Sequence, residues 1–600
     1  MTSDAPRSRL VAARTMIGFA WRADQGRTLL TVALYALQAA LAALFALWLK
    51  LLIDGVQAHR LAEAAPAAAM VAVSVAAGAG LDFAASRVRM GLNERVHHLV
   101  ERRLIEAVGR TPTLEIQETP AHVAQLELLN GESWEFGDVI PSLVNLFATA
   151  VRVVVAALLL VTVSPLLLLL PLFGLPTLML SPFTGSLFNK GNELAEEPSR
   201  RATDLFELAT GSAGAKEVRV FRLAGAIIER FHRAQAEVRR IHVRLWAQGR
   251  AIGLGAQLIF LAGYVGAIAF SVERARSGRT GVGDVVMTAV LAGQVLGLIT
   301  GSANMLQWAS RTLRSAGRYV YLVEVAARSR AVVDPSLQIP TRLHDGIRLQ
   351  GVSYHYPSAP GDALCSVDLH LPAGTTVAVV GENGAGKTTL VKLLAALYRP
   401  TAGTVTVDGV DLFRMDPDRW RERVSASFQD YARLEFLIRE AVGVGSLDHL
   451  ENRSEAAAAL ERAGAADLVP ALPQGLETQL GPAWPRGVDL SGGQWQKVAL
   501  GRAMMRMAPL LLLLDEPTAA LDAETEHRLF NSWTGAAREL REQTGAITVL
   551  VSHRFSTVRM ADLILVLRQG RLVEQGDHAA LMRRGGLYAE LYTLQAAAYR

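Results

Sequence analysis

The stretch that decides the fold of the C-terminal half is VAVVGENGAGKTTL, from Val377 to Leu390. Its first four residues predict a buried strand, and the rest matches the pattern G-x-x-x-x-G-K-[ST]. In this pattern the glycines turn successive backbone N–H groups toward a phosphate, and the following helix adds the positive end of its dipole. A chance glycine-rich turn is the alternative, but every required position is filled between a strand and an apolar helix. The stretch therefore predicts a phosphate-binding loop in an α/β domain.

Two side chains of this loop have separate expected roles. The Lys387 ammonium carries a charge toward the β- and γ-phosphate oxygens, and the Thr388 hydroxyl is expected to bind Mg²⁺. ATP and Mg²⁺ are therefore the predicted ligands. The residues expected to contact ATP here are Gly381, Glu382, Asn383, Gly384, Ala385, Gly386, Lys387, Thr388 and Thr389.

Five consecutive leucines, Leu510–Leu514, precede two adjacent carboxylates. The run is far too short to cross a bilayer and predicts a strand buried on both faces. We expect Asp515 to lie in the metal shell and Glu516 to act on the water that attacks the γ-phosphate. A solvated acidic turn is the alternative, and the position after a buried strand disfavours it. A later strand-like run, TVLVSH, ends at His553, which is expected to reach the γ-phosphate region. A purely structural histidine is the alternative, and the order and spacing after Glu516 disfavour it.

The N-terminal half carries apolar runs of bilayer-spanning length. Ser164 and Pro165 separate two of these runs and predict a tight external hairpin. Arginine-rich polar helices follow the second and fourth runs, so the positive-inside rule places them and both termini in the cytoplasm. One short external loop runs against this rule with Arg274, Arg276 and Arg279, but it is outnumbered. We predict about six spans in all. Their approximate bounds are Leu29–Ile53, Ala64–Ala85, Ile140–Val163, Leu166–Phe183, Ile252–Val272 and Val285–Ile299.

Composition excludes several other classes of protein. Hydrophobic residues make up 51% of the chain and charged residues 20%, and the apolar excess lies in the first half. The net charge is +5, but many arginines flank apolar runs instead of clustering on one soluble face, which disfavours nucleic acid as a partner. The single cysteine, Cys365, excludes an internal disulfide and a cysteine metal cluster. We expect no cleavable signal peptide.

Together these patterns predict an all-α transmembrane domain of about six long helices, followed by an α/β P-loop NTPase domain. We expect a cytoplasmic N-terminal segment over residues 1–26 and the transmembrane domain over residues 27–320. Polar residues and spaced prolines predict a linker over residues 321–345. The nucleotide-binding domain is expected over residues 346–600.

These residues resemble one family, the ATP-binding cassette (ABC) transporters in the half-transporter arrangement, over essentially the whole chain. The resemblance implies that Tyr356 in VSYHYP stacks on adenine. It also implies that Gln429 in FQD contacts Mg²⁺ and that His553 is the switch histidine, so that both act with Glu516 in catalysis. The family's loop beyond the catalytic carboxylates corresponds to Ala519–Asp522.

The resemblance assigns a further role to LSGGQ, Leu490–Gln494. Ser491 and Gly493, with Gly492 and Gln494, are expected to cap ATP held by the P-loop of a second chain. A head-to-tail homodimer is therefore expected, because the site residues are all of the consensus type. ATP binding would close the dimer and hydrolysis would release it, so that the membrane halves alternate between inward- and outward-facing states.

Two cytoplasmic segments, Glu115–Glu127 and Gly211–Phe221, are the expected levers of this motion, with solvated helices as the alternative. The chain departs from the family pattern before the signature, where Pro482 and Trp484 lie near the position of a common Gly-Glu pair. This departure replaces residues that in the family usually make the contact between the nucleotide-binding domain and such a lever. Trp495, after the signature, is expected to pack within the signature helix.

Polar residues in or next to the apolar runs are candidates for a cargo path. Arg152 is the first of them because a charge at membrane depth is costly, with a snorkelling side chain as the alternative. The remaining candidates, which equally suit hydrogen bonds between helices, are Asn145, Gln257, Gln294 and Asn304.

The strings SGGQWQK and FQDYARLEF resemble bacterial exporters of modified peptides such as lantibiotics. The expected function is ATP-driven export of a small modified peptide, or another amphipathic compound, across the bacterial cytoplasmic membrane. Export of lipids or drugs is one alternative. Import of a siderophore-like compound by the same architecture is a second, and a membrane-tethered signalling ATPase that moves no cargo is a third.

Overall fold

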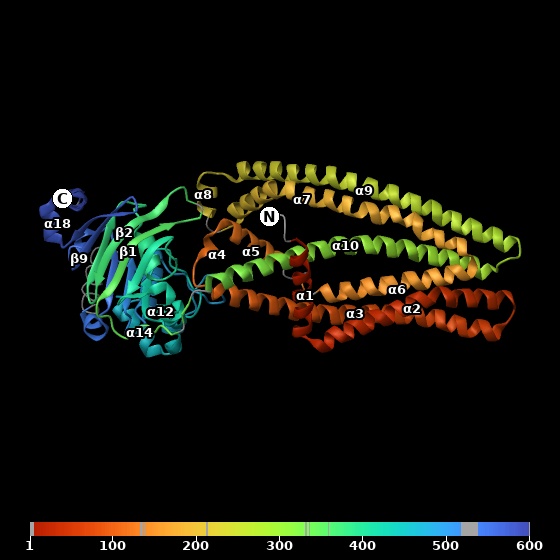
Figure 1. The fold of residues 1–600 in the computed structure, drawn as a ribbon, viewed down its shortest axis with the longest axis horizontal. Helices are drawn as coiled ribbons and strands as arrows, with labels where there is room; N and C mark the ends of the chain where they lie inside the picture. The colour runs from red at the N-terminus through yellow and green to blue at the C-terminus, as the bar shows by residue number, and fades with distance from the viewer. Residues whose placement is uncertain are drawn as a thin grey trace. The chain divides into compact units, whose positions relative to one another are not determined.

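A computed structural model of the chain describes residues 5–132, 136, 138–211, 214–330, 333–334, 336–357, 359–517 and 538–598. The chain divides into two compact units. The first unit, Met1–Glu106 with Gln125–Tyr321, consists of helices over its described residues (Figure 1). The second unit, Ala107–Ala124 with Leu322–Arg600, contains both β-sheets.

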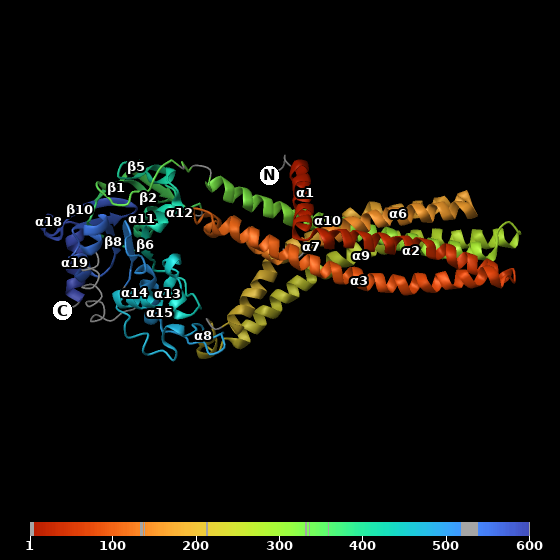
Figure 2. The ribbon, with the colours of Figure 1, turned by 90° about the horizontal axis from the view of Figure 1, so that it is seen from below.

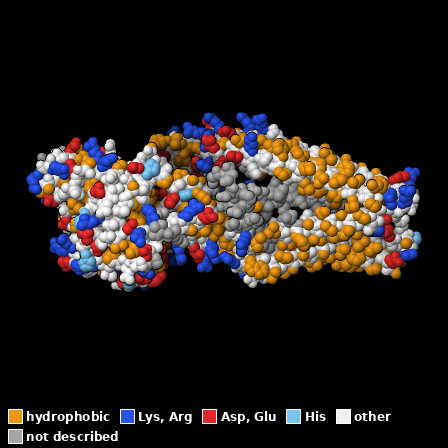
Figure 3. All heavy atoms as spheres, in the orientation of Figure 1, with side chains coloured by type: hydrophobic (Ala, Val, Ile, Leu, Met, Phe, Trp, Pro, Cys, Tyr) orange, Lys and Arg blue, Asp and Glu red, His pale blue; other side chains and the backbone are white. Residues whose placement is uncertain are grey.

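Long helices that run side by side form the first unit (Figures 1 and 2). Among the described residues, five helical segments are long and apolar enough to cross a membrane, and α10 adds a shorter apolar stretch, Val282–Val295. The predicted set of about six long helices is therefore confirmed. Figure 3 shows hydrophobic side chains over the outer surface of this bundle. The helices are α1 Ala5–Ala23, α2 Gln25–Gln57, α3 Leu61–Gly109, α5 Pro120–Glu132, α6 Val139–Val163, the 3₁₀ helix η2 Pro165–Gly174, α7 Leu175–Thr210, α8 Ala215–Val220, α9 Ala224–Arg276 and α10 Val282–Arg330.

Small residues let these helices approach one another closely. A Cβ atom added at Gly263 of α9 would lie 2.5 Å from the Phe173 ring of η2, and one at Gly174 would lie 2.0 Å from Ile299 of α10. Close approach through glycine is typical of helix packing in lipid. The two glycines therefore fix where η2 rests against its neighbours.

The predicted linker over residues 321–345 is helical in its first part, residues 321–330. Helix α10 continues to Arg330, well beyond the last apolar span. The reason is local, because YLVEVAARSR, residues 321–330, contains neither Gly nor Pro, whereas the polar residues and prolines that mark a linker come after it.

The second unit has the predicted α/β fold with much parallel sheet. Its six-stranded sheet has the order β10-β9-β3-β8-β7-β6, and all neighbours pair in parallel except β10 with β9. A second, antiparallel sheet has the order β2-β1-β4-β5. The strands are β1 Gly346–His355, β2 Asp362–Pro372, β3 Thr376–Gly381, β4 Ala402–Val407, β5 Val410–Asp411, β6 Val424–Ser427, β7 Leu511–Asp515, β8 Ile547–Val551, β9 Leu563–Arg568 and β10 Arg571–Gly576.

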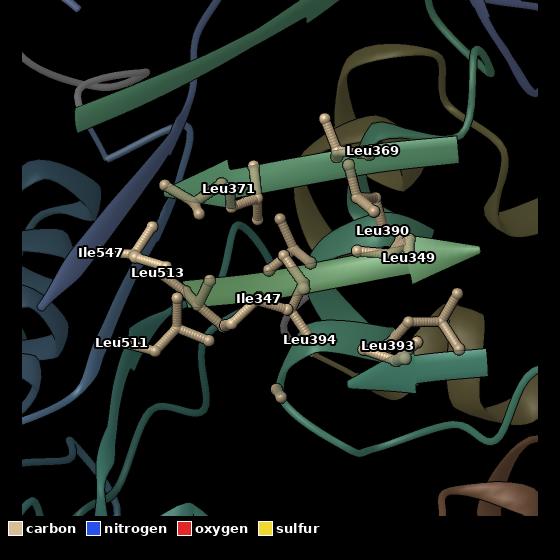
Figure 4. Packing of buried hydrophobic residues seen from close by; sticks show 14 of the residues in the cluster. Ile347, Leu349, Leu369, Leu371, Leu390, Leu393, Leu394, Leu511, Leu513 and Ile547 are labelled. Carbon is tan, nitrogen blue, oxygen red and sulfur yellow. The ribbon is translucent and has the colours of Figure 1, made fainter. Parts of the chain in front are cut away.

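Helix α11, Lys387–Leu394, contributes to the core that joins the two sheets. Its buried Leu390, Leu393 and Leu394 lie close to leucines and isoleucines of both sheets (Figure 4). Strand β7 is buried along its whole length, which confirms the prediction from the leucine run. This core therefore fixes the position of α11 relative to the sheets. The P-loop is the short connection between β3 and α11.

The remaining helices of this unit surround the sheets. Helix α15 begins within the signature, and α19 is the last helix of the described residues (Figure 2). The bounds are α4 Glu115–Glu118, α12 Pro417–Glu422, α13 Ile438–Gly443, α14 Arg453–Arg462, α15 Gly492–Ala503, α17 Phe555–Val558, α18 His578–Arg584 and α19 Leu587–Ala598, with short 3₁₀ turns at Leu412–Arg414, Leu447–His449 and Gly475–Glu477.

Candidate functional site

A pocket of about 680 Å³ lies in the second unit, where loops follow the carboxyl ends of its parallel strands. This edge is where α/β sheets bind ligands, because the loops after neighbouring strands converge there. The pocket brings together most of the predicted site residues. Its lining consists of Tyr356, Ala363, Asn383, Gly384, Ala385, Gly386, Lys387, Thr388, Thr389, Gln429, Glu516 and His553.

The P-loop has a backbone that favours glycine. Gly386 adopts a left-handed φ of +99°, and an added Cβ there would lie 2.5 Å from the carbonyl oxygen of Ala363. A larger residue would therefore displace backbone that the pocket requires. The Lys387 ammonium donates to the carbonyl oxygens of Gly381 and Glu382, at 2.9 Å each.

Lys387 is 7% exposed, and burial lowers the pKa of its ammonium while the charge of Glu516 opposes that shift. An ammonium ion with this little water around it interacts strongly with an anion that enters the pocket. The loop thus offers a cradle of backbone N–H groups with one concentrated positive charge, which fits a polyphosphate.

The three predicted catalytic residues are in contact. Nε2 of His553 lies 2.5 Å from Oε1 of Glu516, and Nε2 of Gln429 donates to Oε2 of Glu516 at 2.8 Å. Glu516 itself adopts a left-handed φ of +48°, and its backbone N–H donates to the carbonyl oxygen of Val551 on β8. A positive φ in a non-glycine residue is strained and is held here by the surrounding structure. These contacts fix the direction of the carboxylate.

Asp515, the predicted metal ligand, is 1% exposed, and neither carboxylate oxygen has a well-formed hydrogen bond within the described residues. Burial raises the pKa of Asp515, while the Thr388 hydroxyl and the charge of Lys387 oppose the shift. A buried carboxylate with so little hydrogen bonding is costly unless a cation compensates it. Asp515, Thr388 and Gln429 all offer oxygen atoms, which is the donor type that Mg²⁺ prefers, so the residues present fit that ion.

Tyr356 lines the same pocket from the loop after β1. Its hydroxyl lies 3.2 Å from Oγ1 of Thr389, and its ring packs edge-on against Tyr398 with the centroids 5.4 Å apart. These contacts hold the ring beside the P-loop, where the resemblance places an adenine-stacking aromatic.

The signature residues are not among those that line this pocket of their own chain. Ser491 caps α15: its backbone N–H donates to Oε1 of Gln494 at 2.9 Å, and its Oγ accepts from the Gln494 N–H at 3.3 Å. This capping box leaves Gly492 and Gly493 in the first turn of the helix. Trp495 is 2% exposed in the core beneath, which confirms its expected packing. Ala519–Asp522 lie outside the described residues.

Two glutamines contact the catalytic residues and were not predicted. Nε2 of Gln496, two residues past the signature, donates to the carbonyl oxygen of Glu516 at 3.1 Å. Nε2 of Gln595 in α19 donates to the carbonyl oxygen of His553 at 2.7 Å, and its Oε1 accepts from the N–H of Phe555. Their only sequence signal is an amide side chain, which is too common to be informative.

A short helix from the first expected lever, α4, lies in the second unit and contacts its core. Glu118 pairs with Lys392 at 3.2 Å and accepts a hydrogen bond from the Tyr398 hydroxyl. Burial and this bond raise the pKa of Tyr398, which therefore stays a neutral donor. Because Tyr398 packs against Tyr356, two side chains connect α4 to the expected adenine platform. The second expected lever contains α8, which belongs to the first unit.

The polar candidates for a cargo path have varied surroundings. Arg152 donates to Asn145 at 3.3 Å and to Thr149 at 3.2 Å, both on its own helix α6. Nε2 of Gln294 donates to the carbonyl oxygen of Ala42 on α2 at 3.4 Å. Gln257 lines a cavity in α7 and α9. The Asn304 side chain lies outside the described residues.

Family comparisons agree with this geometry. Residues 364–519 match the family model described as ABC transporter, and residues 28–299 match the model described as ABC transporter transmembrane region. The chain belongs to the ABC transporter family. Residues 364–519 belong to the second unit, and most of residues 28–299 belong to the first, helical unit.

This ABC transporter is 34% identical over 431 residues to the mitochondrial potassium channel ATP-binding subunit of Rattus norvegicus, covering 71% of the chain and 57% of the relative. It is 34% identical over 370 residues to the ATP-dependent lipid A-core flippase of Chromobacterium violaceum, covering 61% of the chain and 60% of the relative. The chain thus spans less than two thirds of the length of these curated relatives.

A solved structure supports the predicted fold class over nearly the whole chain. This structure, of a bacterial Atm1-family ABC exporter with ATP bound, has a TM-score of 0.75 and 24% sequence identity to this ABC transporter. The match covers 95% of this chain and 98% of that one.

Proposed function

We propose that this ABC transporter hydrolyses ATP and uses the energy to export an amphipathic compound as a homodimer. The observation that carries the proposal is that the P-loop lysine, Gln429, Glu516 and His553 line one and the same pocket. A phosphate cradle beside a fixed carboxylate suits phosphoryl transfer to water. The bundle of membrane-length helices on the same chain supplies the part through which cargo would pass.

The residues of the pocket have separate roles in hydrolysis. Lys387 and the P-loop N–H groups bind the triphosphate, and Asp515 and Thr388 would hold Mg²⁺. When bound, Mg²⁺ neutralises charge on the phosphate oxygens. Glu516 orients the attacking water and accepts its proton, while His553 and Gln429 keep the carboxylate in place through the contacts at 2.5 and 2.8 Å.

The homodimer is proposed because the signature of one chain does not line its own nucleotide pocket. Ser491 and Gly493 at the start of α15 would then complete the site of the partner. The N-terminal end of a helix with free N–H groups is well suited to an anion such as the γ-phosphate.

Co-expression of two inactive variants tests this arrangement. Lys387→Ala and Ser491→Arg should each abolish hydrolysis alone, whereas chains of the two kinds in one dimer should regain one intact site. With random association we expect about a quarter of the wild-type phosphate release. If the mixture stays inactive although mixed dimers are recovered by a two-tag purification, the signature does not act on the partner's nucleotide.

The contact of α4 gives a second prediction. Glu118→Ala removes the partner of Tyr398 and Lys392, so the ring of Tyr356 loses support and ATP binding weakens. We expect the KM for ATP to rise about threefold with little change in kcat, which corresponds to part of one hydrogen bond. Glu115→Ala, on the same short helix, is the matched control. Equal effects of both substitutions would argue for general loosening of α4.

The favoured cargo is a small modified peptide, which is supported by the strings SGGQWQK and FQDYARLEF. Lipid is the second candidate because curated relatives are named as lipid A-core flippases. Both are amphipathic, and both would leave the cytoplasmic side of the bacterial membrane. Alternating access driven by ATP would account for either.

Transport in inside-out membrane vesicles tests the function. A fluorescent lantibiotic-type peptide and a fluorescent phospholipid should be compared, with ATP and with a non-hydrolysable analogue. We expect ATP-dependent accumulation of one probe, absent from the Glu516→Gln variant. Uptake only by right-side-out vesicles would indicate an importer. ATPase stimulation without accumulation in either orientation would indicate a signalling ATPase.

A further inference from the structure

A cavity of about 560 Å³ lies within the helical unit between α7 and α9, which run side by side in Figures 1 and 2. Its size is in the range of pockets that bind small organic molecules. Its lining extends from Thr177 to Phe188 on α7 and from Leu245 to Gln257 on α9. These segments include the cytoplasmic ends of the predicted fourth and fifth spans, so the cavity lies at the expected inner boundary of the membrane.

One wall of the cavity is aromatic. The rings of Phe188 and Trp246 stack with centroids 4.9 Å apart, and His242 stacks on Trp246 at 4.8 Å. Such stacking restrains the large Trp246 side chain, which remains 42% exposed. The wall therefore presents ordered apolar surface without needing a bound ligand to arrange it.

The polar side of the cavity carries one positive charge. Among the described residues that line it, Arg250 is the only charged one, and no described residue forms a hydrogen bond or ion pair with its guanidinium. The Thr177 hydroxyl also lines the cavity, buried and without a described hydrogen-bond partner. A guanidinium near a membrane, with no acid beside it, attracts carboxylate, sulfonate or phosphate groups, which it can bind through two parallel hydrogen bonds.

Glycine keeps part of the cavity open. Gly253 lines it, and a Cβ atom added there would meet nothing within 4 Å. Gly255, two residues further along α9, also has open space around an added Cβ but does not line the cavity. A large side chain at position 253 should therefore fill the cavity, whereas the same side chain at position 255 should leave the cavity unchanged.

We propose that this cavity binds amphipathic organic anions, with the apolar body against Phe188 and Trp246 and the anionic group on Arg250. Charge complementarity selects this occupant, because the cavity combines a cation that has no partner among the described residues with an apolar wall. The proposal rests on the proposed export function, since it defines the class of cargo that the helical unit first receives from the cytoplasmic side.

Two fluorescent probes with the same body test the binding site. 8-Anilino-1-naphthalenesulfonate is anionic, and N-phenyl-1-naphthylamine is its neutral analogue. With full-length protein in phosphatidylcholine nanodiscs, Arg250→Gln should weaken saturable binding of the sulfonate about tenfold and leave the neutral probe unchanged. Gly253→Leu should weaken both probes, and Gly255→Leu neither. Basal ATPase activity should stay unchanged in all three variants, which shows that they fold.

Three results would overturn the proposal. The first is sulfonate affinity that does not respond to Arg250→Gln, and the second is an equal loss in the two glycine variants. The third is a change of oligomeric state in Gly253→Leu, measured by light scattering, since side chains of the second copy would then fill the cavity. A further arm adds phosphatidylglycerol: if this lipid removes the Arg250-dependent binding and the sulfonate never stimulates ATPase activity, the cavity holds lipid and not cargo.

A different pattern of results is expected if the proposed export function is wrong. In that case inside-out vesicles accumulate no probe with ATP, while the Arg250- and Gly253-dependent binding persists in nanodiscs. Loss of that binding with transport intact would instead overturn the site and leave the export function standing.

Discussion

Replacing Glu516 by Gln should lower the rate of ATP hydrolysis by about 10²–10⁴-fold, because an amide cannot accept the proton of the attacking water. The amide has the size of the carboxylate and can keep the contact with Gln429, so the pocket should retain its shape. ATP affinity is expected to stay within about twofold of wild type, because this interaction belongs to the transition state. Phosphate release and equilibrium binding of a fluorescent ATP analogue measure the two quantities.

The control for this experiment is Glu461→Gln on α14, which removes an exposed carboxylate elsewhere in the same unit. It should leave both quantities unchanged. A Glu516→Gln protein that hydrolyses ATP at the wild-type rate would show that another group activates the water. Loss of ATP binding in parallel with hydrolysis would show that Glu516 mainly supports the pocket.

Replacing Lys387 by Ala should weaken ATP binding itself by about 10²-fold, since the loss removes charge-assisted hydrogen bonds to phosphate in a site with little water. The Lys387 ammonium is buried among P-loop carbonyls and has no substitute among the residues that line the pocket. Titration with a fluorescent ATP analogue in the presence of Mg²⁺ measures the dissociation constant.

Lys497→Ala is the matched control for Lys387. Its ammonium pairs with the exposed carboxylate of Asp467 at 3.0 Å, away from the pocket lining. Surface ion pairs of this kind contribute little, so binding and hydrolysis should stay near wild type. If Lys387→Ala bound ATP as well as Lys497→Ala does, the backbone of the P-loop would suffice for binding.

The nucleotide pocket was largely predictable because its chemistry depends on short motifs. The P-loop and the strand before Asp515 each carry their geometry within a few consecutive residues, and the structure places them along one sheet edge. Glu516 and His553 were brought together by the family resemblance, and the structure gives the physical reason, since both follow buried strands and β7 and β8 are neighbours in the sheet.

Contacts between distant segments were not predictable. Tyr398 and Glu118 are 280 positions apart, and no local pattern in either segment specifies the other. Gln496 and Gln595 donate to backbone carbonyl oxygens. Every residue has such an oxygen, so the sequence does not indicate which one they contact. The extent of α10 was missed for another reason, since helix propensity continues after the apolar pattern ends.

The 3₁₀ helix η2 has a consequence for how the chain matches the thickness of a bilayer. The apolar run Leu166–Phe183 would reach only about 27 Å as a regular α-helix. With its first part wound as η2, at about 2.0 Å per residue, the same run reaches about 31 Å, close to the hydrocarbon thickness of about 30 Å. The tighter winding also aligns every third side chain, and Leu167 and Leu170 are the buried pair on that line. The expected fourth span thus gains about 4 Å of length by changing its helical pitch, with no added residues.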